Sequence, residues 1–169
     1  NPRHEVLDSR AHSGIIDYEP AELVIVARSG TALDEIDKVL SEHNQMLGFE
    51  PPFIAKGATL GGAVASGLAG PGRAYRGTVR DFILGAKFIN GKGEIITCGG
   101  KVIKNVAGFD LFRPMAGSLG TLGVLLDLSI RVLPRPEFDR MLLHEENDEQ
   151  RAITKINRWA TQMQTITAA

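Results

Sequence analysis

Glycine is concentrated in one part of the chain, and this constrains the backbone there more than any other feature of the sequence. After Glu50-Pro51-Pro52, glycine occupies positions 57, 61, 62, 67, 70, 72 and 77. Residues without a side chain let the backbone turn sharply and approach a neighbouring segment or a ligand closely. We therefore expect the main chain, rather than side chains, to carry the chemistry of this region.

The stretch from Gly57 to Gly67 would let the start of a helix come close to a ligand. Unpaired amides in the first turn of such a helix, at the favourable end of the helix dipole, can receive phosphate oxygens. A diphosphate is the ligand that fits this interpretation. A tight turn with a close helix contact explains the same residues equally well, because glycine clusters are weak indicators of ligands.

A second cluster of small residues runs from Ala116 to Val124 and has glycine at positions 117, 120 and 123. A backbone that approaches a planar ring closely would need such positions without a side chain. A bulge at the start of the following strand explains them too, and the general behaviour of glycine in strands slightly favours this second interpretation.

The segment before the first cluster predicts a strand followed by a helix. Glu22–Arg28 is a short β-branched run of the kind found in buried strands. Thr31 is expected to cap the helix, with Asp34 three residues later. The apolar face of this helix is expected to comprise Leu33, Ile36, Val39, Leu40 and Leu47. A strand and a helix in this order indicate an α/β layer.

The second half of the chain predicts antiparallel strands. Asn90-Gly91 lies between the apolar runs 82–89 and 94–97, which is among the strongest hairpin signals. From Gly123 to Pro134, polar residues alternate with a set that is expected to face the core: Leu126, Leu128, Ile130 and Val132. Beyond Pro136 we expect a helix with one apolar side formed by Ala152, Ile153, Ile156, Ala160 and Met163.

The composition excludes several classes of function. There are 19 basic and 20 acidic residues, so no overall field attracts nucleic acid or an anionic membrane. Cys98 is the single cysteine, which excludes an internal disulfide and fits a reducing compartment. The four histidines lack the spacing of a metal site and are interpreted as surface residues. No apolar stretch approaches the roughly 20 residues of a membrane-spanning helix.

Three well-known motifs are absent from the sequence. A Walker A loop needs Ser or Thr after Gly100-Lys101, where Val102 stands. The dinucleotide-binding fingerprint is missing after the first strand, since Ser29-Gly30-Thr31 offers a single glycine. Ser118 lacks the glycine that a nucleophile elbow has two residues before its serine, because Ala116 stands there. Hydrolase and Rossmann interpretations therefore both lose support.

A group of charged residues follows the first glycine cluster. It consists of Arg73, Arg76, Arg80 and Asp81. These side chains could meet a ribose or a phosphate, or they could form a surface salt-bridge group. The two interpretations are about equally favoured.

Seven stretches in a fixed order resemble the PCMH-type FAD-binding domain of the vanillyl-alcohol oxidase family, and more closely the FAD-binding subunit of bacterial glycolate oxidases. They are EPP at 50–52, ATLGG at 58–62, GLAGP at 67–71, VRDF at 79–82, KNVAGFDL at 104–111, GSLGTLGV at 117–124 and VLPRP at 132–136. The likeness runs from about Leu7 to Pro136 and is far more specific than any single glycine motif.

The resemblance implies an α/β (α+β) fold made of two α/β subdomains with FAD between them. Residues 1–70 would form the first subdomain, incomplete at its N-terminus, residues 71–136 the second, with antiparallel strands, and residues 137–169 the start of a cap or substrate domain. The family's domain opens with a further glycine-rich loop, so we expect this chain to be a piece of a longer protein. The cofactor contacts implied are Pro52, Gly57, Ala58, Thr59, Leu60, Gly61, Gly62, Val64, Ala65, Gly67, Gly77, Thr78, Asp81, Gly117, Gly123 and Val124.

The activity implied is oxidation of glycolate or a similar 2-hydroxy acid by hydride transfer to the flavin of FAD. A second flavin subunit and an iron–sulfur subunit would be partners, in the cytoplasm or at the inner face of the membrane, and this piece alone is expected to be inactive. The resemblance names no catalytic acid or base here. Two alternatives stay open: an assembly module with the same fold and no cofactor, and an FAD enzyme for D-lactate or another hydroxy acid.

Overall fold

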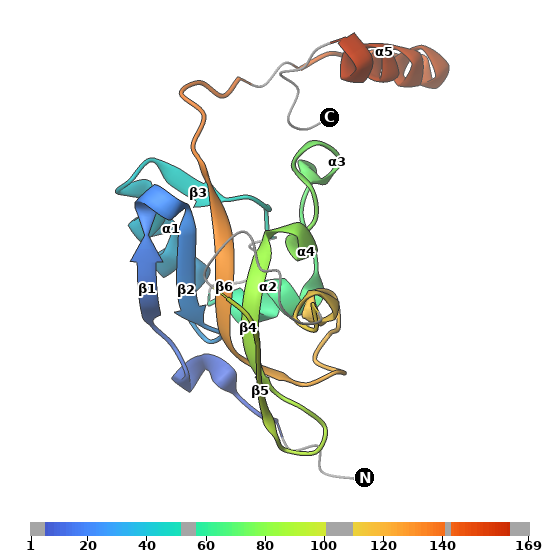
Figure 1. Ribbon diagram of the computed structural model, residues 1–169. Helices are drawn as coiled ribbons and strands as arrows, with labels where there is room; N and C mark the ends of the chain where they lie inside the picture. Colours follow the sequence, from blue (N-terminus) through green and yellow to red (C-terminus); the bar gives the residue numbers. More distant parts are fainter. Residues whose placement is uncertain (1–5, 52–56, 101–109, 141–142, 163–169) are drawn as a thin grey trace.

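The computed structural model describes residues 6–51, 57–100, 110–140 and 143–162 (Figure 1). Its strands are β1 (Ile15–Glu19), β2 (Val24–Arg28), β3 (Gln45–Leu47), β4 (Ile83–Ile89), β5 (Ile95–Gly99) and β6 (Val124–Pro134). Its α-helices are α1 (Leu33–Ser41), α2 (Leu60–Ser66), α3 (Arg73–Arg76), α4 (Val79–Phe82) and α5 (Glu149–Gln162). Short 3-10 turns, η1 to η3, cover Ser9–Ala11, Pro20–Glu22 and Arg113–Met115.

One antiparallel sheet organises the chain, in the order β1-β2-β6-β4-β5, with β3 also paired to β6. The long strand β6 lies between β2 and β4, and it is the element that joins the two halves of the sequence. The expected mixed α/β fold with antiparallel pairing is therefore confirmed. Strands from residues 1–70 and from residues 71–136 share this sheet, so the proposed subdomain division near residue 70 does not separate two sheets, and the division itself stays a prediction.

The core lies between one face of the sheet and the helices α1 and α2, which Figure 1 shows behind the strands. Four of the five residues of β2 are buried, as the β-branched run predicts. Leu33, Ile36 and Leu40 of α1 are buried against the same core. Phe49 and Phe82 join it, with ring centroids 6.2 Å apart. Burial of this apolar surface is the main stabilising term of such a layer.

The predicted helix cap at Thr31 is wrong. Ala32 holds the cap position of α1, with no side-chain cap, and Thr31 is fully buried. The Thr31 Oγ1 instead donates to Arg28 O (2.7 Å) and accepts from Gly14 N (2.9 Å). The helix ends at Ser41, because the chain turns at Asn44 (φ 54°), and Leu47 lies in β3 rather than on the helix face.

The predicted hairpin is confirmed, with the turn centred differently from what Asn90-Gly91 suggests. Gly93 N donates to Asn90 O (3.0 Å) and Asn90 N donates to Glu94 O (3.0 Å). Gly93, at φ 81°, takes the left-handed position, and Gly91 does not. This is the longer hairpin connection that ends in a left-handed glycine, not the two-residue turn that an Asn-Gly pair forms by itself.

The long strand after Gly123 is confirmed as β6, but one residue of its predicted core face is wrong. The pairing with β4 slips between Lys87 and Phe88, which face Asp127 and Leu125. The bulge places Leu125 in the core and leaves Leu126 half-buried, whereas Leu128, Ile130 and Val132 are buried as expected. A bulge reverses the alternation that a strand would otherwise keep.

The helix expected beyond Pro136 is α5. Ala152 and Trp159 are half-buried, Ile153 and Ile156 are exposed, and Met163 lies outside the described residues. The Trp159 ring contacts His144 edge-on, with centroids 5.6 Å apart. None of the helices in the described ranges is long and apolar enough to cross a membrane.

Candidate functional site

The first glycine cluster folds into α2 and its two caps. Thr59 begins the helix, and its Oγ1 accepts from Gly62 N at 3.2 Å. Gly67 ends the helix in the left-handed conformation (φ 67°), with its amide 3.1 Å from both Ala63 O and Val64 O. The small residues of this stretch therefore form a short helix closed at both ends.

The amides of the first turn of α2 are already paired, which contradicts the interpretation that they wait for phosphate oxygens. Leu60 N donates to Thr31 O (2.9 Å), and Gly61 N donates to Ser29 O (2.7 Å). A Cβ on Gly61 would lie 2.6 Å from the Cβ of Ser29. Gly61 is thus bare because the helix packs directly on the end of β2, as the close-contact alternative proposes.

The two glycine clusters meet at the opposite end of α2. Gly117 N donates to Val64 O (3.0 Å), and Leu119 N donates to Ala65 O (2.9 Å). A Cβ on Gly67 would lie 2.9 Å from the Cα of Gly117. Segments some 50 residues apart in the chain are thereby joined into one unit, as a shared ligand requires.

On the unit that the two glycine clusters form, four glycines leave the main chain exposed, with open space beside it. A Cβ added to Gly57, Gly117 or Gly120 would meet nothing within 4 Å, and one added to Gly62 would meet only Thr59 Oγ1, at 3.3 Å. All four glycines are exposed. The hydroxyl of Ser118, between two of them, is buried and has no hydrogen-bond partner among the described residues. A surface of this kind fits a ligand that lies directly on the backbone and bonds to polar main-chain groups.

The other predicted contacts have roles within the fold. Ala58 O accepts from Leu33 N at 2.9 Å, and Val64 is fully buried. A Cβ on Gly123 would lie 2.4 Å from Ile89 O, and Val124 pairs with Ile89 in the sheet. Close strand contact, the alternative weighed for the second cluster, explains Gly123. Pro52 lies outside the described residues.

Thr78 and Asp81 form a capping box at the start of α4. The Asp81 Oδ2 accepts from Thr78 N (2.7 Å) and from Thr78 Oγ1 (2.8 Å). These two hydrogen bonds, with smaller contributions from Arg113 and Arg80, hold the pKa of Asp81 below its usual value. A Cβ on Gly77 would lie 3.0 Å from Asp81 Oδ2, so this glycine makes room for the cap.

The arginines near the first cluster do not all fit the same interpretation, a surface salt-bridge group or a contact to a ribose or phosphate. Arg76 is the salt-bridge residue: its Nη1 lies 3.2 Å from Glu50 Oε1, and its side chain is only 17% exposed. Glu50 also accepts from Gly72 N at 2.8 Å. Arg73 and Arg80 remain exposed. Arg113, which the sequence did not single out, acts on Asp81 and pairs with Asp110 at 3.0 Å; its i, i+3 spacing from Asp110 is the only signal for it.

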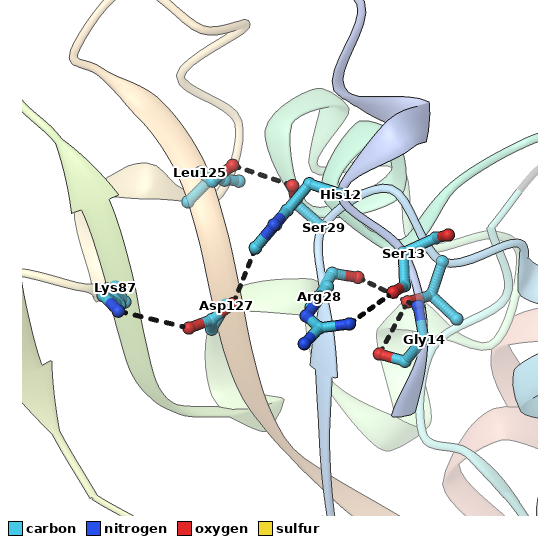
Figure 2. Close-up of polar contacts among 9 residues, drawn as sticks. His12, Ser13, Gly14, Arg28, Ser29, Lys87, Leu125 and Asp127 are labelled. Atoms are coloured by element: carbon cyan, nitrogen blue, oxygen red, sulfur yellow. Dashed lines mark hydrogen bonds and ion pairs between the residues drawn. The ribbon is translucent and has the colours of Figure 1, made fainter. Parts of the chain in front are cut away.

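A polar cluster on the sheet was also missed (Figure 2). His12 Nε2 lies 2.9 Å from Asp127 Oδ1, and Lys87 Nζ lies 3.8 Å from Asp127 Oδ2. The His12 side chain is 41% exposed and that of Asp127 is 22% exposed. His12 is a surface residue, as expected, but a paired one. The separation of 115 residues leaves no local signal for this contact.

Comparison with known proteins indicates the family of the chain. The "FAD binding domain" family matches residues 3–99. Glycolate oxidase subunit GlcE of Escherichia coli is 50% identical over 158 residues, which are 94% of this chain and 45% of the relative. D-lactate dehydrogenase of Archaeoglobus fulgidus is 35% identical over 71% of this chain and 27% of its own length. Glycolate oxidase subunit GlcD of Bacillus subtilis is 31% identical over 76% of this chain and 27% of its own length.

The chain thus spans less than half the length of these curated relatives. A solved structure of alkyldihydroxyacetonephosphate synthase shares the fold, with a TM-score of 0.61 and 23% identity over 76% of this chain and 23% of that one. The family match over residues 3–99 identifies the chain as a member of the FAD-binding domain family, with FAD as its cofactor.

Proposed function

We propose that this chain forms the FAD-binding part of an enzyme that oxidises a 2-hydroxy acid, glycolate to glyoxylate. The observation that carries the proposal is the meeting of the two glycine clusters at the end of α2, with bare main chain facing open space on both. The names of the relatives supply the substrate class: two are glycolate oxidase subunits and others are dehydrogenases of D-lactate and D-2-hydroxyglutarate.

The residues proposed to hold FAD act through the backbone. The exposed segments at Gly57, Gly62, Gly117 and Gly120 provide the surface, and the Ser118 hydroxyl provides a polar group that lacks a partner among the described residues. Bound FAD would supply the redox chemistry, as the acceptor of the hydride from the carbon that bears the hydroxyl. The chain's own contribution is to fix and orient this surface through α2, whose two ends are bonded to residues 29–31, just after β2, and to the second cluster.

We further propose that the protein works as a subunit of a glycolate oxidase-like complex. Two relatives are named as subunits of such an enzyme, which supports a multisubunit assembly. A second flavin subunit and an iron–sulfur subunit are the partners proposed to receive the electrons, in the cytoplasm or at the inner face of the membrane.

A substitution that covers the bare surface without disturbing the fold tests the cofactor proposal. Gly62→Leu places a good helix former at an exposed helical position whose Cβ meets only Thr59 Oγ1. We expect it to fold normally and to weaken FAD binding at least about tenfold, or roughly 1.4 kcal/mol, measured by flavin fluorescence titration of the purified protein.

Gly91→Leu is the control, because Gly91 is also exposed, has open space around its Cβ and lies in the hairpin turn. It should bind FAD as the unchanged protein does. A folded Gly62→Leu protein with unchanged FAD affinity would contradict the proposed site.

The names of the relatives also favour a second substrate, D-lactate. Assay of the complete complex against a panel of hydroxy acids separates glycolate from D-lactate. The assembly-module alternative predicts that Gly62→Leu leaves both activity and recovery of partner subunits unchanged, whereas the enzyme proposal predicts loss of flavin and of activity together.

A further inference from the structure

The segment Ser9–Gly14 is bound to Gly30 and Thr31, just beyond β2. Gly30 N donates to His12 O (2.9 Å), and Gly14 N donates to Thr31 Oγ1 (2.9 Å). A Cβ on Gly30 would lie 2.1 Å from Ser9 O, so the segment crosses directly over Gly30. It therefore packs directly on residues 29–31, through the Gly30 backbone and the Thr31 hydroxyl.

Residues 29–31 also hold the first turn of α2. Ser29 O accepts from Gly61 N (2.7 Å), and Thr31 O accepts from Leu60 N (2.9 Å). Ser29 and Thr31 are buried, and Ser29 Oγ donates to Leu125 O at 2.8 Å. This short piece of chain is thus bonded on one side to Ser9–Gly14 and on the other to the helix that carries Gly62.

The His12 side chain connects Ser9–Gly14 to the centre of the sheet. Because an ionised carboxylate only accepts hydrogen bonds, His12 Nε2 must donate to Asp127 Oδ1. Lys87 of β4 contacts the other oxygen of Asp127, and Arg28 of β2 donates from Nη1 to Ser13 O at 2.9 Å. Figure 2 shows the three basic side chains arranged around Asp127 and Ser13. Asp127 and Arg28 face each other in the strand register.

We propose that His12 is a positioning residue of the FAD site. Its bond to Asp127 holds Ser9–Gly14 against residues 29–31, and through them it fixes the first turn of α2. The effect on FAD binding rests on the proposed function above, whereas the effect on α2 rests only on these contacts.

The test compares two substitutions of His12 in the purified chain. His12→Ala removes the bond to Asp127, and His12→Gln keeps a side-chain N–H that can donate to the same oxygen. Hydrogen exchange of the Leu60 and Gly61 amides, measured without FAD, reports directly on the bonds to Thr31 O and Ser29 O. Because His12→Ala loses a half-exposed hydrogen bond to a carboxylate, we expect the Leu60 and Gly61 amides to exchange about fivefold faster in it. In His12→Gln their exchange should return to the rate of the unchanged protein.

Two controls separate positioning from general stability. The Asn90 amide, which bonds to Glu94 O in the hairpin, is an internal reference and should not change. His43→Ala removes a histidine that packs edge-on against Tyr18 and should leave the Leu60 and Gly61 amides unaffected. Unchanged exchange at both amides in His12→Ala, equal acceleration at Asn90, or equal loss in His12→Gln would each overturn the proposal.

FAD titration of the same proteins distinguishes this inference from the proposed function. We expect the Kd for FAD to rise about fivefold in His12→Ala and to recover in His12→Gln. Failure of the unchanged protein to bind FAD would contradict the proposed function, and the exchange of Leu60 and Gly61 would still decide whether His12 positions α2.

Discussion

Gly61 and Gly62 are neighbours in α2, yet alanine at the two positions should change stability in opposite directions. Gly61 is buried against Ser29, and an added Cβ would lie 2.6 Å from Ser29 Cβ and 2.9 Å from Ser29 O. Gly62 is exposed, and its Cβ would meet only Thr59 Oγ1, at 3.3 Å. Both positions are helical, so the intrinsic preference for alanine over glycine is the same.

The magnitudes follow from these contacts. Carbon atoms in contact normally lie about 3.5–4.0 Å apart, so Gly61→Ala must push α2 roughly 1 Å away from Ser29. That displacement strains the core by about 1–3 kcal/mol and breaks or lengthens the 2.7 Å bond from Gly61 N to Ser29 O, worth about 1 kcal/mol. Helix propensity returns up to about 1 kcal/mol. We expect Gly61→Ala to lower the free energy of unfolding by about 2 kcal/mol and Gly62→Ala to raise it by about 0.5 kcal/mol.

Urea unfolding followed by circular dichroism measures both values. The two midpoints should lie on opposite sides of that of the unchanged protein, with equal slopes. A Gly61→Ala protein as stable as the unchanged one would refute the close packing of α2 on β2. A destabilised Gly62→Ala protein would refute the open space over Gly62.

Two further predictions concern the junction of the clusters and the α4 cap. Gly67→Ala should lower the free energy of unfolding by about 2 kcal/mol, because Gly67 has a left-handed backbone (φ 67°) and its added Cβ would lie 2.9 Å from Gly117. Gly93 is also left-handed but has open space around it, so Gly93→Ala should show only the backbone part of this loss, about 1 kcal/mol. Equal losses of stability in urea unfolding would argue against the junction. Asp81→Ala should destabilise by about 1 kcal/mol at neutral pH. Because the pKa of Asp81 is lowered from 3.8, its contribution is present above pH 3.8 and is lost as the pH falls through the lower folded pKa. The two proteins should therefore converge in acid, and a difference independent of pH would rule out the ionised cap.

Local patterns in the sequence predicted much of the fold. The β-branched run gave β2, the helical spacing gave α1, and Asn90-Gly91 marked the β4–β5 hairpin. The errors arose where a distant partner decides the outcome. Thr31 is drawn away from capping α1 by Gly14 and Arg28, and the slip opposite Lys87 and Phe88 exchanges Leu125 for Leu126 in the core. Neither effect has a signal in the local sequence.

For the candidate site, the positions of the small residues were informative and their individual roles were not. Glycine marks close approach, but it does not say to what. Gly61 approaches Ser29 and Gly123 approaches Ile89, whereas a Cβ on Gly62 would meet only Thr59 Oγ1, at 3.3 Å, and a Cβ on Gly117 would meet nothing within 4 Å. The sequence could not separate these two groups, because the distinction depends on packing between segments far apart in the chain.

The central claim is that the two glycine clusters form one surface for one molecule of FAD. Hydrogen exchange of the protein with and without FAD tests it most directly, because the two clusters and the 90–94 hairpin are read in the same experiment. We expect FAD to slow exchange in residues 57–67 of the first cluster and 117–121 of the second, with the same dependence on FAD concentration, and to leave the hairpin unchanged. Binding of FAD that protects only one cluster, or neither, would contradict it.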